Sequence, residues 1–219
     1  MGGNGFTEPA NYPEVFRVER VLGADLDGDD APEIVAYTGG AARIYRNDGT
    51  GAFTPANEAL AVYSVWSFFL VDVDGDTDLD LVGGSALWLN DGDAVFTAGQ
   101  SLPSSVSAAG DFDADGDVDF AGSTGSTGGA SVRLSVFDND GMGVFTPRHA
   151  GVSTLGGYGT TATVTADFDA DGTLDTAITS YGFTSGGAGG QFFSGVNIFS
   201  NRGFGGYDTN ASGVPDSCE

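Results

Sequence analysis

The chain has 219 residues, which is enough for one or two domains with a sizeable core. Hydrophobic residues make up 40% of it, which excludes a disordered chain although the formal net charge is -24. All seven basic residues are arginines, against 31 acidic residues, and such a chain is expected to bind neither nucleic acid nor an anionic membrane, because both would repel it.

Glycine and cysteine content narrow the fold class. The 37 glycines follow no three-residue period and accompany only 7 prolines, which excludes collagen and indicates many tight turns. The single cysteine, Cys218, allows no internal disulfide. No apolar stretch approaches the roughly 18 residues of a membrane span, so no membrane insertion is expected. Frequent turns between short β-prone runs predict an all-β chain.

The chain opens with a segment that matches a later one. Residues 3–9 (GNGFTEP) resemble residues 49–55 (GTGAFTP), where an aromatic residue opens a predicted strand. We therefore expect residues 1–10 to complete a sheet that the last part of the chain begins. Such pairing would close the fold on itself and remove exposed sheet edges.

An acidic nine-residue pattern then recurs at residues 25–33, 72–80, 111–119 and 167–175, with carboxylates at positions 1, 3, 5 and 9 of every copy. A β-prone run precedes each copy and another follows it. A third run ends in an Asn-x-Gly turn, whose residues tolerate positive φ, and in the first three copies an aromatic residue opens a fourth run. The pattern predicts four units of four strands, which are residues 11–58, 59–101, 102–149 and 150–207.

These loops and turns resemble the FG-GAP or VCBS repeats of β-propellers, which include the heads of integrin α chains and many secreted bacterial proteins. The resemblance implies an all-β propeller of four-stranded antiparallel blades over residues 1–207. A four-bladed ring closed by the first strand is slightly preferred over a fragment of a larger propeller. An open arc would expose apolar surface on its two terminal blades. Repeats one and two depart from the family at position 6, where Asp30 and Thr77 replace glycine.

The acidic loops predict calcium, because alternate carboxylates of a tight loop can turn inward together around a hard cation. Zinc would require Cys and His ligands, magnesium would keep more water, and an EF-hand needs flanking helices and a glutamate at position 12. Solvated acidic turns are the alternative, which four copies in register make less attractive. The expected ligands are the carboxylates at positions 1, 3, 5 and 9 and the carbonyl at position 7, listed loop by loop: Asp25, Asp27, Asp29, Ala31 and Glu33; Asp72, Asp74, Asp76, Asp78 and Asp80; Asp111, Asp113, Asp115, Asp117 and Asp119; Asp167, Asp169, Asp171, Thr173 and Asp175.

The tail, residues 208–219, carries a different calcium-type pattern, D-x-N-x-S-G-x5-E, with Glu219 at position 12. It resembles a single thrombospondin type-3 repeat, whose cysteine normally has a partner. Cys218 has none in this chain, so we expect a truncated motif rather than a functional thiol. Its expected ligands are Asp208, Asn210, Ser212 and Asp216.

Nothing in the sequence favours catalysis. The one histidine, His149, follows a turn and has no apparent nucleophile beside it, so the chain is expected not to be an enzyme. We expect a secreted or cell-surface calcium-binding module that mediates protein or glycan binding or adhesion. A non-catalytic propeller domain of a carbohydrate-active enzyme and a structural spacer are the alternatives.

The expected ligand surface lies on the face opposite the acidic loops. The third and fourth repeats carry long connections there, at residues 122–130 and 180–194. The aromatic residues of the second connection, Tyr181, Phe183, Phe192 and Phe193, either contact a ligand or cap the core. Extracellular calcium modules bind at about 10⁻⁴ to 10⁻³ M, so we expect export and a signal peptide upstream of Met1.

Overall fold

The computed structural model describes residues 10–12, 17–125, 132–148, 159–184 and 191–202. These residues form strands, turns and bends, and none of them is helical, so the part of the chain that is described holds no helix long and apolar enough to cross a membrane. The predicted all-β fold is confirmed. The strands form four antiparallel sheets in which neighbours in sequence are neighbours in space.

The strand bounds follow the four repeats. The first sheet contains β1 (Val18–Ala24), β2 (Glu33–Thr38), β3 (Ala41–Asn47) and β4 (Phe53–Ala61). The second contains β5 (Phe68–Val71), β6 (Asp80–Gly83), β7 (Ala86–Asn90) and β8 (Phe96–Ala98). The third contains β9 (Val106–Gly110), β10 (Asp119–Gly125), β11 (Val132–Asn139) and β12 (Phe145–Arg148). The fourth contains β13 (Gly159–Ala166), β14 (Asp175–Thr184) and β15 (Gln191–Phe199).

The second strand is buried on both faces in the first two sheets. In β2, Val35 is fully buried and the adjacent Ala36 and Tyr37 are nearly so. In β6, every residue is buried. A strand with one solvated face would alternate apolar and polar residues instead. The register is continuous: Val35 pairs with Leu22 of β1 on one side and Ile44 of β3 on the other.

The core lies between consecutive sheets, as blade packing requires. One cluster joins Leu26 and Val35 of the first sheet to Phe68 and Phe96 of the second. A second joins Val73 and Val82 to Phe120, Phe137 and Phe145 of the third sheet, where the rings of Phe120 and Phe145 stack with centroids 4.5 Å apart. A third joins Phe112 and Ala121 to Ile178 of the fourth sheet.

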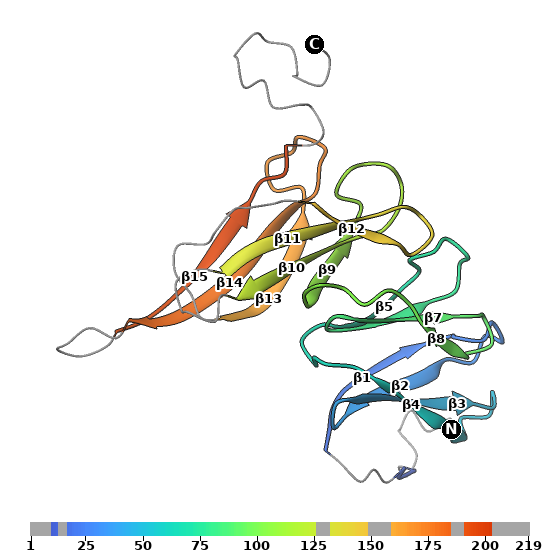
Figure 1. Cartoon of the computed structure of the whole chain (residues 1–219). Coiled ribbons are helices and arrows are strands. Elements are labelled where there is room, and N and C mark those ends of the chain that lie inside the picture. Colours follow the sequence, from blue (N-terminus) through green and yellow to red (C-terminus); the bar gives the residue numbers. More distant parts are fainter. Residues whose placement is uncertain (1–9, 13–16, 126–131, 149–158, 185–190, 203–219) are drawn as a thin grey trace, which may run out of the picture.

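The described sheets form an open arc. Figure 1 shows β1–β4 at one end and β13–β15 at the other, with the two remaining sheets between them in sequence order. The expected closed ring is therefore not what the described residues form. The segment expected to close it, residues 6–9, lies outside the described residues, so its pairing with the fourth sheet stays a prediction.

Candidate metal centres

Each sheet carries one acidic loop between its first and second strands. We number the residues of each loop by positions 1 to 9, so that position 9 is the first residue of the second strand in every sheet. The loops are residues 25–33, 72–80, 111–119 and 167–175. The hydrogen bonds of the sheet therefore fix the backbone at position 9. The loop leaves the first strand at position 1 and enters the second strand at position 9.

The position 1 carboxylate organises the loop by accepting hydrogen bonds from the loop backbone. In each loop it accepts two N–H groups at 2.8 to 3.2 Å. The position 5 carboxylate accepts the N–H of position 7 at 2.8 to 2.9 Å. These are Asx-type turns, which tighten the loop and turn its carboxylates to one side.

All four loops place positions 4 and 6 in the left-handed region, and each loop has one glycine at these two places. In the first two loops the glycine is at position 4, and Asp30 (φ 68°) and Thr77 (φ 79°) carry the strain at position 6. In the last two loops Ala114 (φ 63°) and Ala170 (φ 61°) stand at position 4 and the glycine is at position 6. The departure of Asp30 and Thr77 from the family pattern therefore preserves the backbone path.

The position 9 carboxylate is buried and bridges two strands. It is Glu33, Asp80, Asp119 and Asp175 in the four loops, each of them 0% exposed. One oxygen accepts the N–H of position 2, at 2.8 to 2.9 Å. The other accepts the N–H of the asparagine at the end of the third strand or, in the fourth sheet, two residues beyond it, at 2.7 to 3.2 Å. This clamp ties the loop to the Asn-x-Gly turn of the same sheet.

Burial of this carboxylate changes its acidity. Desolvation raises the pKa of Asp80 to about 6, against the two N–H donors that favour the charged form. The pKa of Asp119 is raised to about 6 for the same reason. Protons and cations are the two species that relieve such a buried negative charge.

Position 3 supplies the observation that points to a ligand. In the first three loops one oxygen of this carboxylate is buried and has no hydrogen-bond partner; the atoms are Asp27 Oδ1, Asp74 Oδ1 and Asp113 Oδ1. Burial, followed by the neighbouring carboxylates, raises the pKa of all three groups. A buried acceptor with no donor is costly, and its recurrence at one loop position marks a place where a cation could bind.

The loops bring together some of the predicted ligands. Carboxylate oxygens lie within 4.8 Å of one another in five groups: Asp25, Asp27 and Asp29; Asp72, Asp74 and Asp80; Asp111, Asp113 and Asp115; Asp113, Asp119 and Asp138; Asp167, Asp169 and Asp175. These groups do not include Glu33, Asp76, Asp78, Asp117 or Asp171. All-oxygen donors of this kind suit a hard divalent cation, so the residues present fit the metal that the sequence predicts.

Asp138 is a site residue that the repeat pattern did not indicate. It precedes the turn asparagine of the third sheet, where the other sheets have Arg46, Leu89 and Ser200. Its carboxylate forms an ion pair with Arg148: Nε of Arg148 donates a hydrogen bond to Oδ2 at 3.0 Å, and Nη2 lies 2.8 Å from Oδ1. The same Nη2 lies 3.2 Å from Asp113, so a guanidinium already offsets part of the charge at the third loop.

The Asn-x-Gly turn packs against position 7 of its own loop. A Cβ on Gly92 would lie 2.5 Å from Asp78 Oδ2, and one on Gly141 would lie 2.6 Å from Asp117 Oδ2. Both glycines also have positive φ, of 85° and 76°. Glycine suits this turn for two reasons: it adopts the positive φ without strain, and it leaves space for the side chain at position 7 of the loop.

The family scan fits this geometry. The model described as FG-GAP-like repeat matches residues 25–83 and 111–178, together more than half of the chain, and the two matches contain all four acidic loops. The chain belongs to the FG-GAP-like repeat family. The resemblance stated from the loops and turns is thereby confirmed. A search of curated proteins returned no match.

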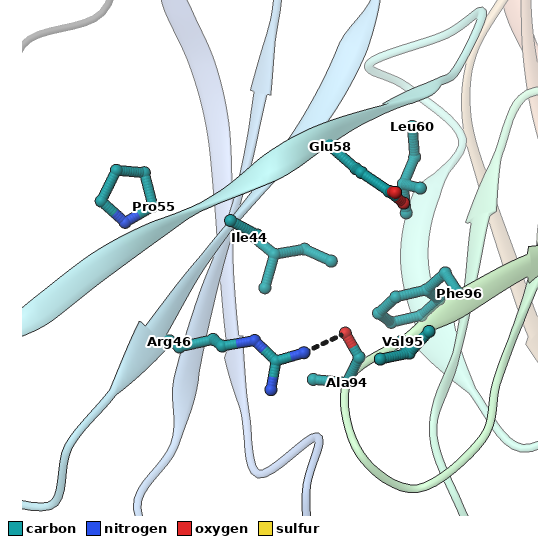
Figure 2. A pocket seen from close by; sticks show the side chains of 9 residues that line it. Ile44, Arg46, Pro55, Glu58, Leu60, Ala94, Val95 and Phe96 are labelled. Carbon is teal, nitrogen blue, oxygen red and sulfur yellow. Dashed lines mark hydrogen bonds between the residues drawn. The ribbon is translucent and has the colours of Figure 1, made fainter.

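The first two FG-GAP-like repeats also line a pocket beside the first acidic loop, where Nη1 of its lining residue Arg46 lies 3.7 Å from Asp27 Oδ2. It has a volume of about 400 Å³ and lies between β3, β4 and the turn before β8. Figure 2 shows Ile44, Leu60 and Phe96 around it, with Arg46 donating a hydrogen bond to the carbonyl of Ala94 at 3.0 Å. This bond joins β3 of the first sheet to the turn before β8 of the second.

Several predicted positions lie outside the described residues. They include the whole tail motif, with Asp208, Asn210, Ser212, Asp216 and Cys218, and also His149. Of the four aromatic residues expected on the opposite face, Tyr181 in β14 is 49% exposed.

Proposed function

We propose that this FG-GAP-like chain is a calcium-stabilised binding module of an exported protein, and not an enzyme. The observation that carries the calcium part is the buried, unpartnered oxygen at position 3 of three loops, each set among neighbouring carboxylates. Six to eight oxygen ligands at flexible geometry are typical of calcium, and the loops offer carboxylates and carbonyls within one turn.

The residues that would hold calcium differ between loops. Positions 1 and 3 contribute in every loop; position 5 joins them in the first and third, and position 9 in the second and fourth. In the third loop, position 3 also groups with Asp119 at position 9 and with Asp138. Bound calcium would neutralise carboxylates that otherwise repel one another, and would thereby stiffen the loop. The chain's own residues hold the loop path without help from the ion, because the turns and clamps are made by backbone N–H donors.

A calorimetric calcium titration of chelator-treated protein tests the proposal. We expect binding with Kd of about 10⁻⁴ to 10⁻³ M, the range of extracellular modules, and a higher melting temperature with calcium than with EDTA. Asp74→Asn should remove one site, because Asp74 holds an unpartnered oxygen in the second loop. Glu19→Gln, which removes a carboxylate from the exposed first strand of another sheet, is the control and should bind as the wild type does.

The titration also separates the parts of the proposal. Absence of heat and an unmoved melting curve would contradict calcium binding. Binding with sub-micromolar Kd would contradict export, because such affinity suits the cytosol.

We place the ligand surface at the ends of the sheets opposite the loops, where β14 continues to Thr184 and Tyr181 is exposed. A rigid aromatic side chain at such an end suits sugar rings or a protein surface. A glycan array probed with the calcium-loaded chain tests the glycan branch. We expect discrete hits that Tyr181→Ala weakens; hits that survive this variant unchanged would place the ligand elsewhere.

A further inference from the structure

The two inner sheets of the arc pack against neighbouring sheets with both faces, and each of the two end sheets packs against a neighbouring sheet with one face. We call the face toward the next sheet in sequence the trailing face and the other the leading face. A row of three paired residues crosses each trailing face, one from each of the first three strands. The rows are Leu22–Val35–Ile44, Phe69–Val82–Leu87 and Ala108–Ala121–Val136, and each belongs to the hydrophobic cluster shared with the following sheet.

The same row exists in the fourth sheet, but its two outer members are open, and only the middle residue, Ala177, is buried. Val164 pairs with Ala177, and Ala177 pairs with Ile198, so their side chains form the equivalent row. Val164 is 57% exposed and Ile198 is 61% exposed, whereas the equivalent Val136 is 7% exposed. Val196, two residues before Ile198 on the same face of β15, is 68% exposed.

The residue at position 2 of the acidic loop is likewise buried in the first three repeats and exposed in the fourth. Leu26, Val73 and Phe112 are each 2% exposed, because the following sheet covers them. Phe168, their equivalent, is 47% exposed. Position 2 is therefore covered in the first three repeats and open in the fourth, since no described sheet follows the fourth sheet.

The leading face of the first sheet is open at its first strand only. Over the third and fourth strands lies Tyr12, with its ring centroid 6.0 Å from that of Tyr45 and 5.9 Å from that of Phe53, and Tyr12 is itself 37% exposed on this face. Val21 is 59% exposed, and it alternates with Leu22, which packs toward the second sheet. The turn before β4 is also uncovered: a Cβ on Gly51 would meet nothing within 4 Å. At the equivalent Gly143 of the third sheet, a Cβ would lie 3.6 Å from Val73 of the preceding loop.

A hydrogen bond completes each internal interface. The turn asparagine of one sheet donates through Nδ2 to the position 2 carbonyl of the sheet before: Asn90 to Leu26 at 2.9 Å, Asn139 to Val73 at 2.7 Å, and Asn201 to Phe112 at 2.7 Å. Asn47 of the first sheet instead donates to Pro32 in its own loop, at 3.1 Å.

We propose that a second copy of this chain docks head to tail, with its first sheet on the trailing face of the fourth sheet. The open ends of one chain are the two halves of an interface that the chain already makes three times, with an apolar row, a position 2 residue and a turn asparagine in each. The two ends differ, so the contact is heterologous and gives a closed ring or an open chain of copies. Exposed apolar residues gathered on one face are the usual mark of such a site.

Sedimentation of the whole chain in reducing buffer tests this proposal. We expect the wild type to associate as its concentration rises. Ile198→Asp disables the trailing face and Val21→Asp the leading face, so each variant alone should be monomeric. Met142→Asp adds the same charge at a residue of the third turn that is 69% exposed, and should associate as the wild type does.

Mixing the two face variants decides the orientation. Ile198→Asp keeps its leading face and Val21→Asp keeps its trailing face, so the mixture should form a heterodimer and stop there. A monomeric wild type, association of either variant at the wild-type level, or a mixture that stays monomeric would overturn the proposal. Melting curves establish that each variant folds; since the replaced side chains are exposed, we expect little change in them.

Discussion

At the scale of single residues, the position 9 carboxylate is the part of the loop that the fold uses most heavily. It is buried, it opens the second strand, and both of its oxygens accept backbone N–H groups from separate segments. Two hydrogen bonds reduce the cost of burying the charge, but desolvation still raises the pKa of Asp80 and Asp119 to about 6. The same residue therefore holds the loop in place and makes it responsive to protons.

In chelator, the melting temperature should rise by a few degrees as the pH is lowered from about 7 to about 5. The folded pKa of Asp80 and Asp119 is about 6 and the unfolded value is 3.8, so the folded state binds more protons in this range. Stability is thus lost as the pH rises through the folded pKa. Asp119→Asn cannot titrate at this position, so its melting temperature should rise less than that of the wild type. A fall in the wild-type melting temperature would contradict the argument.

At the scale of elements, loop and turn form one unit in each sheet. The position 9 clamp ties them together, and the turn glycine leaves room for the side chain at position 7. The acidic loop and the Asn-x-Gly turn can each be recognised from the sequence, because each is a short local pattern. Their contact cannot be recognised, because it depends on how the strands between them pair. The strands and their meander order follow from turn chemistry and β-prone runs, which are local features of the sequence.

The parts that sequence could not predict depend on contacts between distant residues. Asp138 joins the third site through pairing of β11 with β10 and through Arg148, and no spacing in the repeat indicates it. Phe168 has the same place in its repeat as Phe112, yet its exposure depends on whether another sheet covers it. The partition of left-handed residues between positions 4 and 6 also became visible only in the backbone, because Asp30 and Thr77 adopt φ values that their types disfavour.

Gly92→Ala should destabilise the protein more than Gly51→Ala does. The two glycines have nearly the same φ, 85° and 86°, so both variants bear about 1–2 kcal/mol of left-handed strain. A Cβ at residue 92 would also press on the Asp78 carboxylate, whereas one at residue 51 meets nothing within 4 Å. The Asp78 side chain must rotate out of the way, which should add about 0.5–1.5 kcal/mol to the loss, measured by denaturant unfolding. Equal losses would show that the loop and turn are not coupled.

At the scale of the whole molecule, the arc is a stack of sheets that repeats one interface. Each copy has an apolar row on the trailing face and one asparagine bond to the position 2 carbonyl of the preceding sheet. Stability in such an array is roughly a sum of sheet and interface contributions, so weakening an interface should uncouple its neighbours. The interfaces are also where the metal loops meet the next turn, as in the approach of Gly143 to Val73 and Asp74.

Asn139→Ala should therefore lower the free energy of unfolding more than Asn47→Ala, although both residues end a third strand in the same turn. Asn139 is 5% exposed and its Nδ2 donates to Val73 of the second sheet at 2.7 Å and to Val118 at 3.1 Å. Its loss leaves two carbonyls without this donor, at a cost of about 1–3 kcal/mol for each that stays dry. Asn47 makes only the bond within its own loop, to the carbonyl of Pro32, and this site is exposed, so water can replace the bond.

The measurement is denaturant unfolding at a protein concentration low enough to keep the chain monomeric. Tryptophan fluorescence follows the second sheet, which holds Trp88 in β7, and circular dichroism follows all four sheets. If Asn139 couples the sheets, the two transitions should separate in Asn139→Ala and coincide in Asn47→Ala; equal stabilities and coincident transitions in both variants would show that apolar packing alone joins the blades.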